Sequence, residues 1–575
     1  MIAGRAVSPG VVAEGEPVTI RFGEKPIETR AGQTVLAALV AAGELVCRTT
    51  ASGAPRGVFC GMGVCQDCIL DIDGRPNQRA CMTPVRAGMI VTTARPRPEP
   101  SVVQPDPEMI ALAPDVLVIG GGPAGLAAAA VAAEAGLDVV LIDERSKLGG
   151  QFYKQPADGF RIDERQIDQQ FRNGRALIDR VVASGTRCIS GTTVWAAFGA
   201  DEFWASGPTS SFSVSPRRVV LATGAYERGV PLPGWTLPGF MTTGAAQTLL
   251  RSYQIAPGSR VLLGGNGPLN LQVAAELVRA GVKLVALVEA AARPGPHAMA
   301  ALATMTINAP ALMRDGLAYQ SALRRAGVPI FHRHAIVRVD GGDAVERARI
   351  AEIDDRGNPV AGTEKSFDAD IVCAGYGFLP SNEIARAMGC RHHFDERFGQ
   401  LVAQRDRHGR SSVPHVWIIG DSGGLGGARA AEAAGITAGA DIAGELGRDV
   451  PRQREVRRAL RAIARAKRFQ SALWLLFQAP RIVDQLATPD TVLCRCEEVS
   501  FATVRGVLAG GKATTAGAVK RLTRAGMGRC QGRYCGALVV ELVARKSGTG
   551  IDEFSYFAPR MPFKPVPIST VSSGS

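Results

Sequence analysis

The chain has 575 residues, a hydrophobic fraction of 46% and a formal net charge of +13. That length is too great for one hydrophobic core, so we expect three or more packed domains. The positive charge alone would suit nucleic acid, but no nucleic-acid motif accompanies it and we predict no such partner. No apolar run approaches the ~20 residues of a membrane span. The first residues lack the apolar core of a signal peptide, so we expect a cytoplasmic protein.

The first predicted unit covers residues 1–94. Its sequence predicts strands at 18–22 and 26–30 and a helix at 31–43, followed by a cysteine-rich loop. This order is typical of a small β-grasp ferredoxin. The loop has the spacing Cys-x4-Cys-x2-Cys, which in plant-type ferredoxins holds a [2Fe-2S] cluster. Zinc is the alternative for four thiolates. The predicted ligands are Cys60, Cys65, Cys68 and Cys81.

The Pro-rich residues 95–114 are predicted to be a linker, and a dinucleotide-binding pattern follows it. From Asp115 the sequence DVLVIGGGPAGLAAAAVAAEAGLDVVLIDE predicts strand, glycine turn, helix and strand. The glycines would let a pyrophosphate approach the helix N-terminus, and Glu144 would bind the ribose. Two later segments, RRVVLATGAYERGVPLPG (217–234) and VWIIGDSGG (416–424), resemble motifs of two-dinucleotide-domain flavoproteins, which implies FAD. We assign residues 115–254 and 368–450 to this FAD-binding domain. The predicted FAD residues are Gly120, Gly122, Pro123, Ala124, Gly125, Glu144, Gly150, Gln151, Thr223, Gly224, Gly420 and Asp421.

The same pattern returns at 260–289 as RVLLGGNGPLNLQVAAELVRAGVKLVALVE, an internal repeat that predicts a second nucleotide-binding domain over 255–367. Aligning the repeats pairs Gly120 with Gly265, Gly122 with Gly267, and Glu144 with Glu289. The third glycine of the fingerprint is replaced by Asn270. Glu289 disfavours a 2′-phosphate, so NAD or another adenine nucleotide fits better than NADP. A structural half without a ligand is the alternative.

Residues 451–490 are predicted to be a basic helical connector. Val456, Leu460 and Ile463 recur at helical spacing, with arginines around them. A solvated connector is the favoured interpretation. A docking face for an acidic partner and a peripheral membrane contact are the alternatives.

The unit at 491–548 carries the second cysteine set and precedes a tail at 549–575 that we expect to be extended. Its spacing, Cys-x-Cys-x33-Cys-x4-Cys, resembles the bacterioferritin-associated ferredoxin (BFD) type of small helical [2Fe-2S] domain. Zinc is again the alternative. The predicted ligands are Cys494, Cys496, Cys530 and Cys535.

Taken together, residues 114–570 resemble the FAD-containing subunit of opine oxidases, hydrogen cyanide synthase and hydroxyproline or proline dehydrogenase complexes. Wider kinship is to the alpha subunit of heterotetrameric sarcosine oxidase. Residues 17–94 resemble the small ferredoxin-like subunit of those complexes, here fused to the rest. The resemblance implies an α/β multidomain oxidoreductase with FAD and two [2Fe-2S] clusters.

The same resemblance implies a function and partners. A D-amino-acid-oxidase-like partner subunit would oxidise a C–N bond, and this chain would carry the electrons to a quinone or another carrier. Some relatives hold FMN at a subunit interface. A self-contained NADH-dependent reductase and a non-catalytic redox scaffold are the alternatives. No cysteine pair follows GGQFYKQ (149–155), which excludes a disulfide reductase, and the sequence assigns no catalytic residue.

Overall fold

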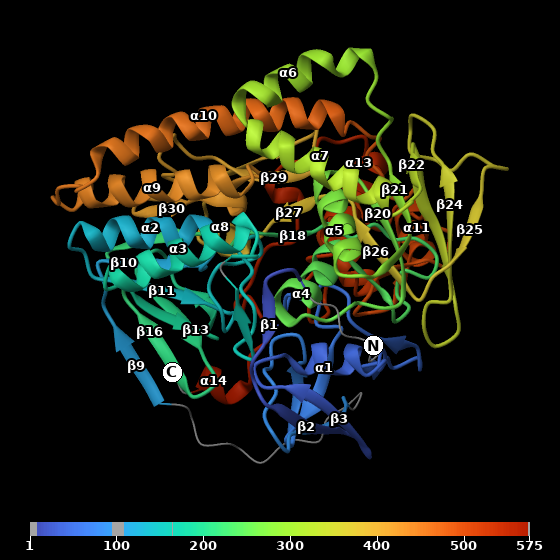
Figure 1. The fold of residues 1–575 in the computed structure, drawn as a ribbon, viewed down its shortest axis with the longest axis horizontal. Helices are drawn as coiled ribbons and strands as arrows, with labels where there is room; N and C mark the ends of the chain where they lie inside the picture. The colour runs from blue at the N-terminus through green and yellow to red at the C-terminus, as the bar shows by residue number, and fades with distance from the viewer. Residues whose placement is uncertain (1–7, 95–107, 164, 573–575) are drawn as a thin grey trace.

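The computed structural model describes residues 8–94, 108–163 and 165–572. The first unit is a five-stranded sheet of order β3-β2-β8-β6-β7 with helix α1 packed on it (Figure 1). Helix α1 begins after Thr34, whose hydroxyl accepts a hydrogen bond from the amide of Ala37, and its apolar residues are buried. The β-grasp expectation is confirmed. The elements are β2 (Pro17–Phe22), β3 (Lys25–Arg30), α1 (Val35–Ala41), β6 (Ile69–Ile72), β7 (Arg75–Arg79) and β8 (Ile90–Thr93).

The first nucleotide-binding unit is built on a parallel sheet of order β13-β11-β10-β17-β30. Helix α2 connects β10 to β11 and packs against α9, which follows β30. These elements are β10 (Val116–Ile119), α2 (Pro123–Glu134), β11 (Val139–Asp143), β13 (Arg187–Ser190), β17 (Arg218–Leu221), β30 (Val416–Ile418) and α9 (Ala428–Glu445).

A second, four-stranded sheet of this unit corrects the predicted linker. Residues 95–107 lie outside the described part of the chain, but Glu108–Leu112 forms strand β9 and pairs in parallel with β16 (Ser210–Val214). Because β9 pairs with a strand about a hundred residues away, no local sequence pattern indicates this pairing. The sequence analysis therefore extended the Pro-rich linker over the strand. The N-terminal segment also reaches this unit, because β1 (Val11–Ala13) pairs with β12 (Phe160–Ile162).

The second nucleotide-binding unit has its own parallel sheet, of order β19-β26-β20-β21-β22. Two of its strands lie beyond the predicted boundaries of 255 and 367, since the edge strand β19 (Phe240–Thr242) and its neighbour β26 (Ile371–Gly375) both belong to it. The FAD-binding unit therefore does not begin again at 368. The remaining elements are α4 (Thr243–Tyr253), β20 (Arg260–Gly265), α5 (Pro268–Arg279), β21 (Lys283–Glu289) and β22 (Ile330–His332).

The basic connector is one long helix, α10 (Gln453–Leu476), which packs against α9 and against α6 (Met299–Asn308). Figure 1 shows it lying across the top of the molecule, spanning both nucleotide-binding units. Ala459, Phe469 and Leu473 are among its buried apolar residues. Among the described residues no helix is long and apolar enough to cross a membrane.

The second cysteine set lies in a small unit made of a two-stranded ribbon and three helices. These are β31 (Val492–Cys494), β32 (Val499–Ser500), α11 (Phe501–Ala509), α12 (Ala516–Thr523) and α13 (Gly536–Ser547). The tail is not simply extended: it contains a 3-10 turn, η3 (Glu553–Ser555), and helix α14 (Ile568–Ser572). Between them Phe563 is 2% exposed in the core of the first nucleotide-binding unit, so burial of one aromatic ring anchors the tail.

The units share cores rather than meeting at thin interfaces. One buried cluster runs from Leu39 of the first unit to Leu263 and Cys373 of the second nucleotide-binding unit. Another joins Phe59, beside the first cysteine loop, to Trp235 and Tyr534. The two cysteine loops are therefore held against the nucleotide-binding units by continuous apolar packing.

Candidate cofactor-binding sites

The first glycine loop is shaped for close approach of a ligand. Gly120 has φ +110°, and a Cβ there would lie 2.4 Å from the carbonyl oxygen of Ala222. A Cβ on Gly125 would lie 1.9 Å from the Gly120 oxygen, so this helix–strand crossing requires glycine. Helix α2 starts at Pro123, directly after the loop. Its free amides and dipole fit a pyrophosphate.

A large cavity of about 1820 Å³ lies between the two nucleotide-binding units and under α10. Thirteen of the fifteen predicted nucleotide-binding residues line it, while Gly125 and Gly265 lie behind it as packing positions. A cavity of this size accommodates a dinucleotide. The lining residues among those predicted are Gly120, Gly122, Pro123, Ala124, Glu144, Gly150, Gln151, Thr223, Gly224, Gly267, Glu289, Gly420 and Asp421.

Asp143, the last residue of β11, and Glu144, which follows it, have different roles. Asp143 is buried, and its carboxylate accepts hydrogen bonds from the amides of Gly121 (2.5 Å) and Arg145 (2.7 Å), which braces the glycine loop. Glu144 faces the cavity and contacts Lys564 from the tail and Arg79 from the first unit, the latter at 3.6 Å. Burial alone would raise the pKa of Glu144, but the two cations outweigh it and lower that pKa.

The loop after β30 is held by its own acidic residue. Asp421 lines the cavity, and its carboxylate accepts hydrogen bonds from the amides of Gly426 (3.0 Å) and Gly427 (3.2 Å). Burial raises the pKa of Asp421. The side chain thus fixes the turn that directs the N-terminus of α9 toward the cavity.

The second glycine loop differs from the first in a way that the sequence alignment concealed. Strand β21 contains a register shift opposite Val261 and Leu262, so Gly265 pairs with Glu289. In the first unit the ladder runs Ile119 opposite Ile142, which puts Asp143 beside Gly120.

Glu289 braces its glycine loop much as Asp143 does, accepting hydrogen bonds from the amides of Gly267 (3.2 Å) and Ala291 (2.9 Å). The loop amide that it holds is one position later than the Gly121 amide held by Asp143. The structural equivalent of Glu289 is therefore Asp143, not Glu144, and Ala290 stands at the position of Glu144. Burial raises the pKa of Glu289 to about 8.

Asn270, which replaces the third glycine, is accommodated by packing. Its amide nitrogen donates to the carbonyl oxygen of Gly375 (2.8 Å), and its oxygen accepts from the hydroxyl of Thr243 (2.9 Å). A Cβ on Gly375 would lie 2.3 Å from the Asn270 oxygen. In the second unit the glycine required at this crossing is therefore Gly375, on the facing strand, and not a residue of the helix. The second loop therefore keeps its shape with the small residue on the strand and the larger one on the helix.

The wall of the cavity also contains ionisable residues that the sequence analysis did not predict. Lys154 donates to the carbonyl of Gln151 and to the side chain of Gln247 (2.9 Å). Glu227 accepts from the amide of Gly244 (2.8 Å). Burial lowers the pKa of Lys154 to about 7 and raises that of Glu227 to about 7. A charged residue inside the apolar-flanked segment GGQFYKQ was the signal available for Lys154.

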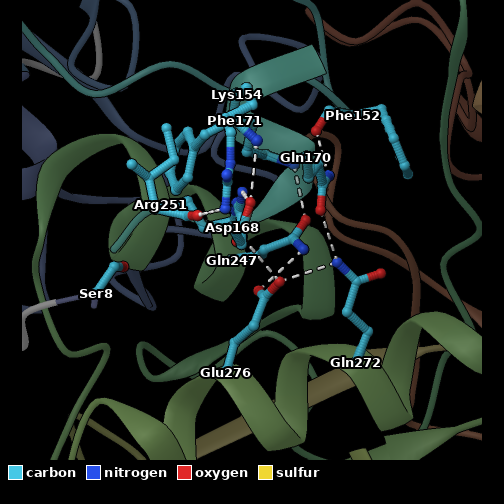
Figure 2. A network of polar contacts seen from close by, with 12 residues as sticks. Ser8, Phe152, Lys154, Asp168, Gln170, Phe171, Gln247, Arg251, Gln272 and Glu276 are labelled. Atoms are coloured by element: carbon cyan, nitrogen blue, oxygen red, sulfur yellow. Dashed lines mark hydrogen bonds and ion pairs between the residues drawn. The ribbon is translucent and has the colours of Figure 1, made fainter. Parts of the chain in front are cut away.

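A polar network links the two nucleotide-binding units beside this lysine (Figure 2). Arg251 on α4 pairs with Asp168 (2.7 Å) of the first unit and with Glu276 (3.1 Å) on α5. Gln247 and Gln272 also donate to Glu276, at 3.0 and 2.9 Å. The network holds the two units in one relative orientation around the cavity.

The first cysteine set is buried and its thiols approach in pairs. The amide of Cys65 donates to the Sγ of Cys60 at 3.3 Å, and the Cys68 thiol is hydrogen-bonded to that of Cys81. Although burial raises it, hydrogen bonds from Cys65 and from backbone amides lower the pKa of Cys60 to about 6. Two neighbouring residues of this loop, Met62 and Val64, line the nucleotide cavity.

The second cysteine set is arranged in a similar way. The Sγ atoms of Cys496 and Cys530 lie 3.4 Å apart, and the thiol of Cys494 is hydrogen-bonded to those of both Cys496 and Cys535. Cys535 is the N-cap residue of α13, where the helix dipole stabilises a thiolate. No group of three or more His, Cys, Asp or Glu among the described residues is arranged around a single-ion position. Four thiols held this close together suit a [2Fe-2S] cluster, in which each iron takes two of the four cysteines.

Comparison with known protein families covers all three parts of the chain. The family model described as "2Fe-2S iron-sulfur cluster binding domain" matches residues 15–96. "Pyridine nucleotide-disulphide oxidoreductase" matches 114–435, and "BFD-like [2Fe-2S] binding domain" matches 492–545. These matches confirm the predicted fold class and imply FAD and iron–sulfur clusters.

Curated relatives match along most of their length. An opine oxidase subunit of Rhizobium meliloti (strain 1021) is 34% identical, over 80% of this chain and 98% of the relative. Hydrogen cyanide synthase subunit HcnB of Pseudomonas protegens is 32% identical, over 79% and 96%. Subunit HcnA of the Pseudomonas aeruginosa synthase is 47% identical over 13% of this chain and 73% of its own length.

Among solved structures, L-proline dehydrogenase from P. horikoshii superposes with a TM-score of 0.71. It is 23% identical, and the match covers 97% of this chain and 98% of the other. This likeness shows that the overall fold is shared.

Proposed function

Because the chain belongs to the family of these opine oxidase and hydrogen cyanide synthase HcnB subunits, we propose that it is the electron-transferring FAD and [2Fe-2S] subunit of an amine or imino-acid dehydrogenase. A D-amino-acid-oxidase-like partner would oxidise the C–N bond of an opine, a proline-type imino acid or glycine. The chain would pass the electrons to a quinone or another carrier. The single observation that carries the proposal is that the first cysteine loop, through Met62 and Val64, forms part of the wall of the nucleotide cavity.

The residues of the chain divide the work among them. The loop at Gly120–Gly122 and the N-terminus of α2 would bind and orient the FAD pyrophosphate, and Glu144 would contact the ribose. The two cysteine sets would hold the clusters. When bound, FAD accepts electrons in pairs and each cluster accepts one, which is the chemistry these groups supply.

Lys154 and Glu227 would hold or release a proton at the cavity wall, since each has a pKa of about 7. Met62 and Val64 present apolar side chains between the cavity and the first cysteine loop, which excludes water from that contact.

The second nucleotide loop favours a ligand that is bound through other groups than the ligand of the first loop. Ala290 offers no carboxylate for ribose hydroxyls. The cavity that this loop lines also has arginines from several elements in its wall, among them Arg293, Arg458, Arg461 and Arg465. We propose an adenine nucleotide held mainly through its phosphates, with no hydride transfer from NADH. The family resemblance also implies FMN at the interface with the partner subunit.

The proposal is tested on the purified chain, alone and with a co-expressed D-amino-acid-oxidase-like subunit from the same host. Iron, zinc and released flavins are quantified, with FAD and FMN separated. Opines, proline, hydroxyproline and glycine are then mixed anaerobically with each preparation.

Bleaching of the flavin and cluster absorbance is expected only when the partner is present, and NADH is expected to leave the isolated chain oxidised. Rapid bleaching of the isolated chain by NADH would instead establish the self-contained reductase. Zinc in place of iron would exclude both.

A further inference from the structure

The two cysteine loops, more than four hundred residues apart in sequence, are joined by a buried ion pair. Asp67 stands between Cys65 and Cys68, and Arg495 stands between Cys494 and Cys496. The Nε atom of Arg495 lies 2.7 Å from Oδ2 of Asp67. The two side chains are 5% and 1% exposed. Each member of the pair is therefore flanked on both sides by predicted cluster ligands.

Both charges are held firmly by their surroundings. The guanidinium of Arg495 stacks on Phe59 (4.0 Å to the ring centroid) and on Trp235 (4.8 Å), and it donates to the carbonyl of Trp235. Asp67 also pairs with Arg48 (3.0 Å), and its backbone amide donates to the Sγ of Cys65 (3.4 Å). An aromatic contact also joins the two loops. The ring centroids of Phe59 and Tyr534, which directly precede Cys60 and Cys535, lie 5.0 Å apart.

A pair buried to this degree is not explained by stability. Desolvating two charges costs several kcal/mol per ion, and apolar residues of similar volume often serve the fold as well. What buried charges do provide is a strong local field, because little water is present to screen them. Charge and hydrogen bonding near the sulfurs are among the factors that set the potential of an iron–sulfur cluster.

We propose that Asp67 and Arg495 are a pair of positioning residues that lock the two cysteine loops together and set the reduction potentials of both clusters jointly. The proposal rests on the proposed function only in that the cysteines hold clusters. Arg495 stabilises the additional negative charge of a reduced cluster at either loop, and Asp67 opposes it at both. Because the two loops share one pair, a change at either residue acts on both clusters.

The test uses the full-length holoprotein and redox titrations followed by electron paramagnetic resonance, which distinguishes the two clusters. Arg495→Gln is expected to lower the one-electron reduction constant of both clusters by about tenfold, which corresponds to about 59 mV. Asp67→Asn is expected to raise both. Arg495→Lys keeps the charge and should shift neither constant as far as Arg495→Gln does. Arg505→Gln, which removes a half-exposed arginine paired with Asp484 in the same unit, is the matched control and should leave both potentials in place.

Each outcome decides a separate question. If the wild-type protein contained no iron, both the proposed function and this inference would be refuted. A wild-type protein with both clusters would leave the proposed function intact, and the shared role would then be overturned by either of two results. One is a variant that shifts the potential of one cluster only, and the other is Arg495→Gln and Asp67→Asn moving the potentials in the same direction as each other. If Asp67→Asn fails to retain iron, the comparison of Arg495→Gln with Arg495→Lys decides alone, because a purely packing role makes both arginine variants behave alike.

Discussion

Arg251 is the charge on which the contact between the two nucleotide-binding units depends, and its replacement by methionine has a calculable cost. Its side chain is 3% exposed and that of its partner Glu276 is 11% exposed. Removing one member of such a buried pair typically costs about 3–5 kcal/mol, since the other is left uncompensated. Two amide donors, Gln247 and Gln272, remain on Glu276 and place the expected loss near the lower end. The second partner, Asp168, is 50% exposed, and this contact adds at most about 1 kcal/mol.

The expected destabilisation of Arg251→Met, about 3–4 kcal/mol, is measured by urea unfolding followed through flavin fluorescence and circular dichroism. Arg333→Met is the matched control, because Arg333 pairs with Asp355 at 2.9 Å with both side chains well exposed, and it should cost less than about 1 kcal/mol. The double variant Arg251→Met/Glu276→Gln should recover most of the loss. Equal destabilisation by Arg251→Met and Arg333→Met would refute the reasoning that the buried pair of Arg251 with Glu276 contributes more than an exposed pair.

Three further results are expected. Gly125→Val should release the flavin, because its Cβ would meet the Gly120 oxygen at 1.9 Å, whereas Gly444→Ala on α9, with open space around it, should retain full flavin content; equal flavin content in both would contradict the assigned loop. Cys65→Ser should remove the first cluster's resonance and leave the second cluster and the flavin, with Cys188→Ser as the control that loses no iron. Burial lowers the pKa of Lys154 from 10.5 to about 7, so the unfolded chain binds the additional proton between these values and stability should rise with pH across that window. Lys154→Met should lack this rise in melting temperature, and an unchanged slope would show that another group titrates.

Much of the molecule could be predicted because its signals are local. Cysteine spacing and glycine fingerprints are short motifs, and both cysteine units and the first glycine loop were found from them. Strand β19 was misassigned because an edge strand of three residues has no periodicity. Strand β26 was misassigned because its apolar run does not show which sheet it joins, and its partners β19 and β20 lie more than a hundred residues earlier in the chain. The tail was misjudged for the same reason: the burial of Phe563 follows from a contact with residues hundreds of positions away.

The alignment of the two repeats failed for a different physical reason. A fixed spacing of 24 residues equated Glu144 with Glu289, but the register shift in β21 inserts one residue into the second repeat. Strand β21 is a nearly continuous apolar run, so a one-residue bulge leaves no mark in its hydrophobic pattern, although it moves the last residue of the strand to a new role. Hydrogen bonding to the glycine loop, seen only in three dimensions, identifies Asp143 as the true counterpart.

The contact of Lys564 with Glu144 spans 420 residues, and Phe563 beside it fills the same unit. A ribosome would have made both nucleotide-binding units, α10 and the second cysteine unit before this wall of the flavin cavity could close. Premature termination after residue 548 would therefore yield a protein with every cysteine and glycine motif intact and an open flavin cavity. We expect such a truncated protein to be defective in cofactor binding, although none of its motif residues is altered.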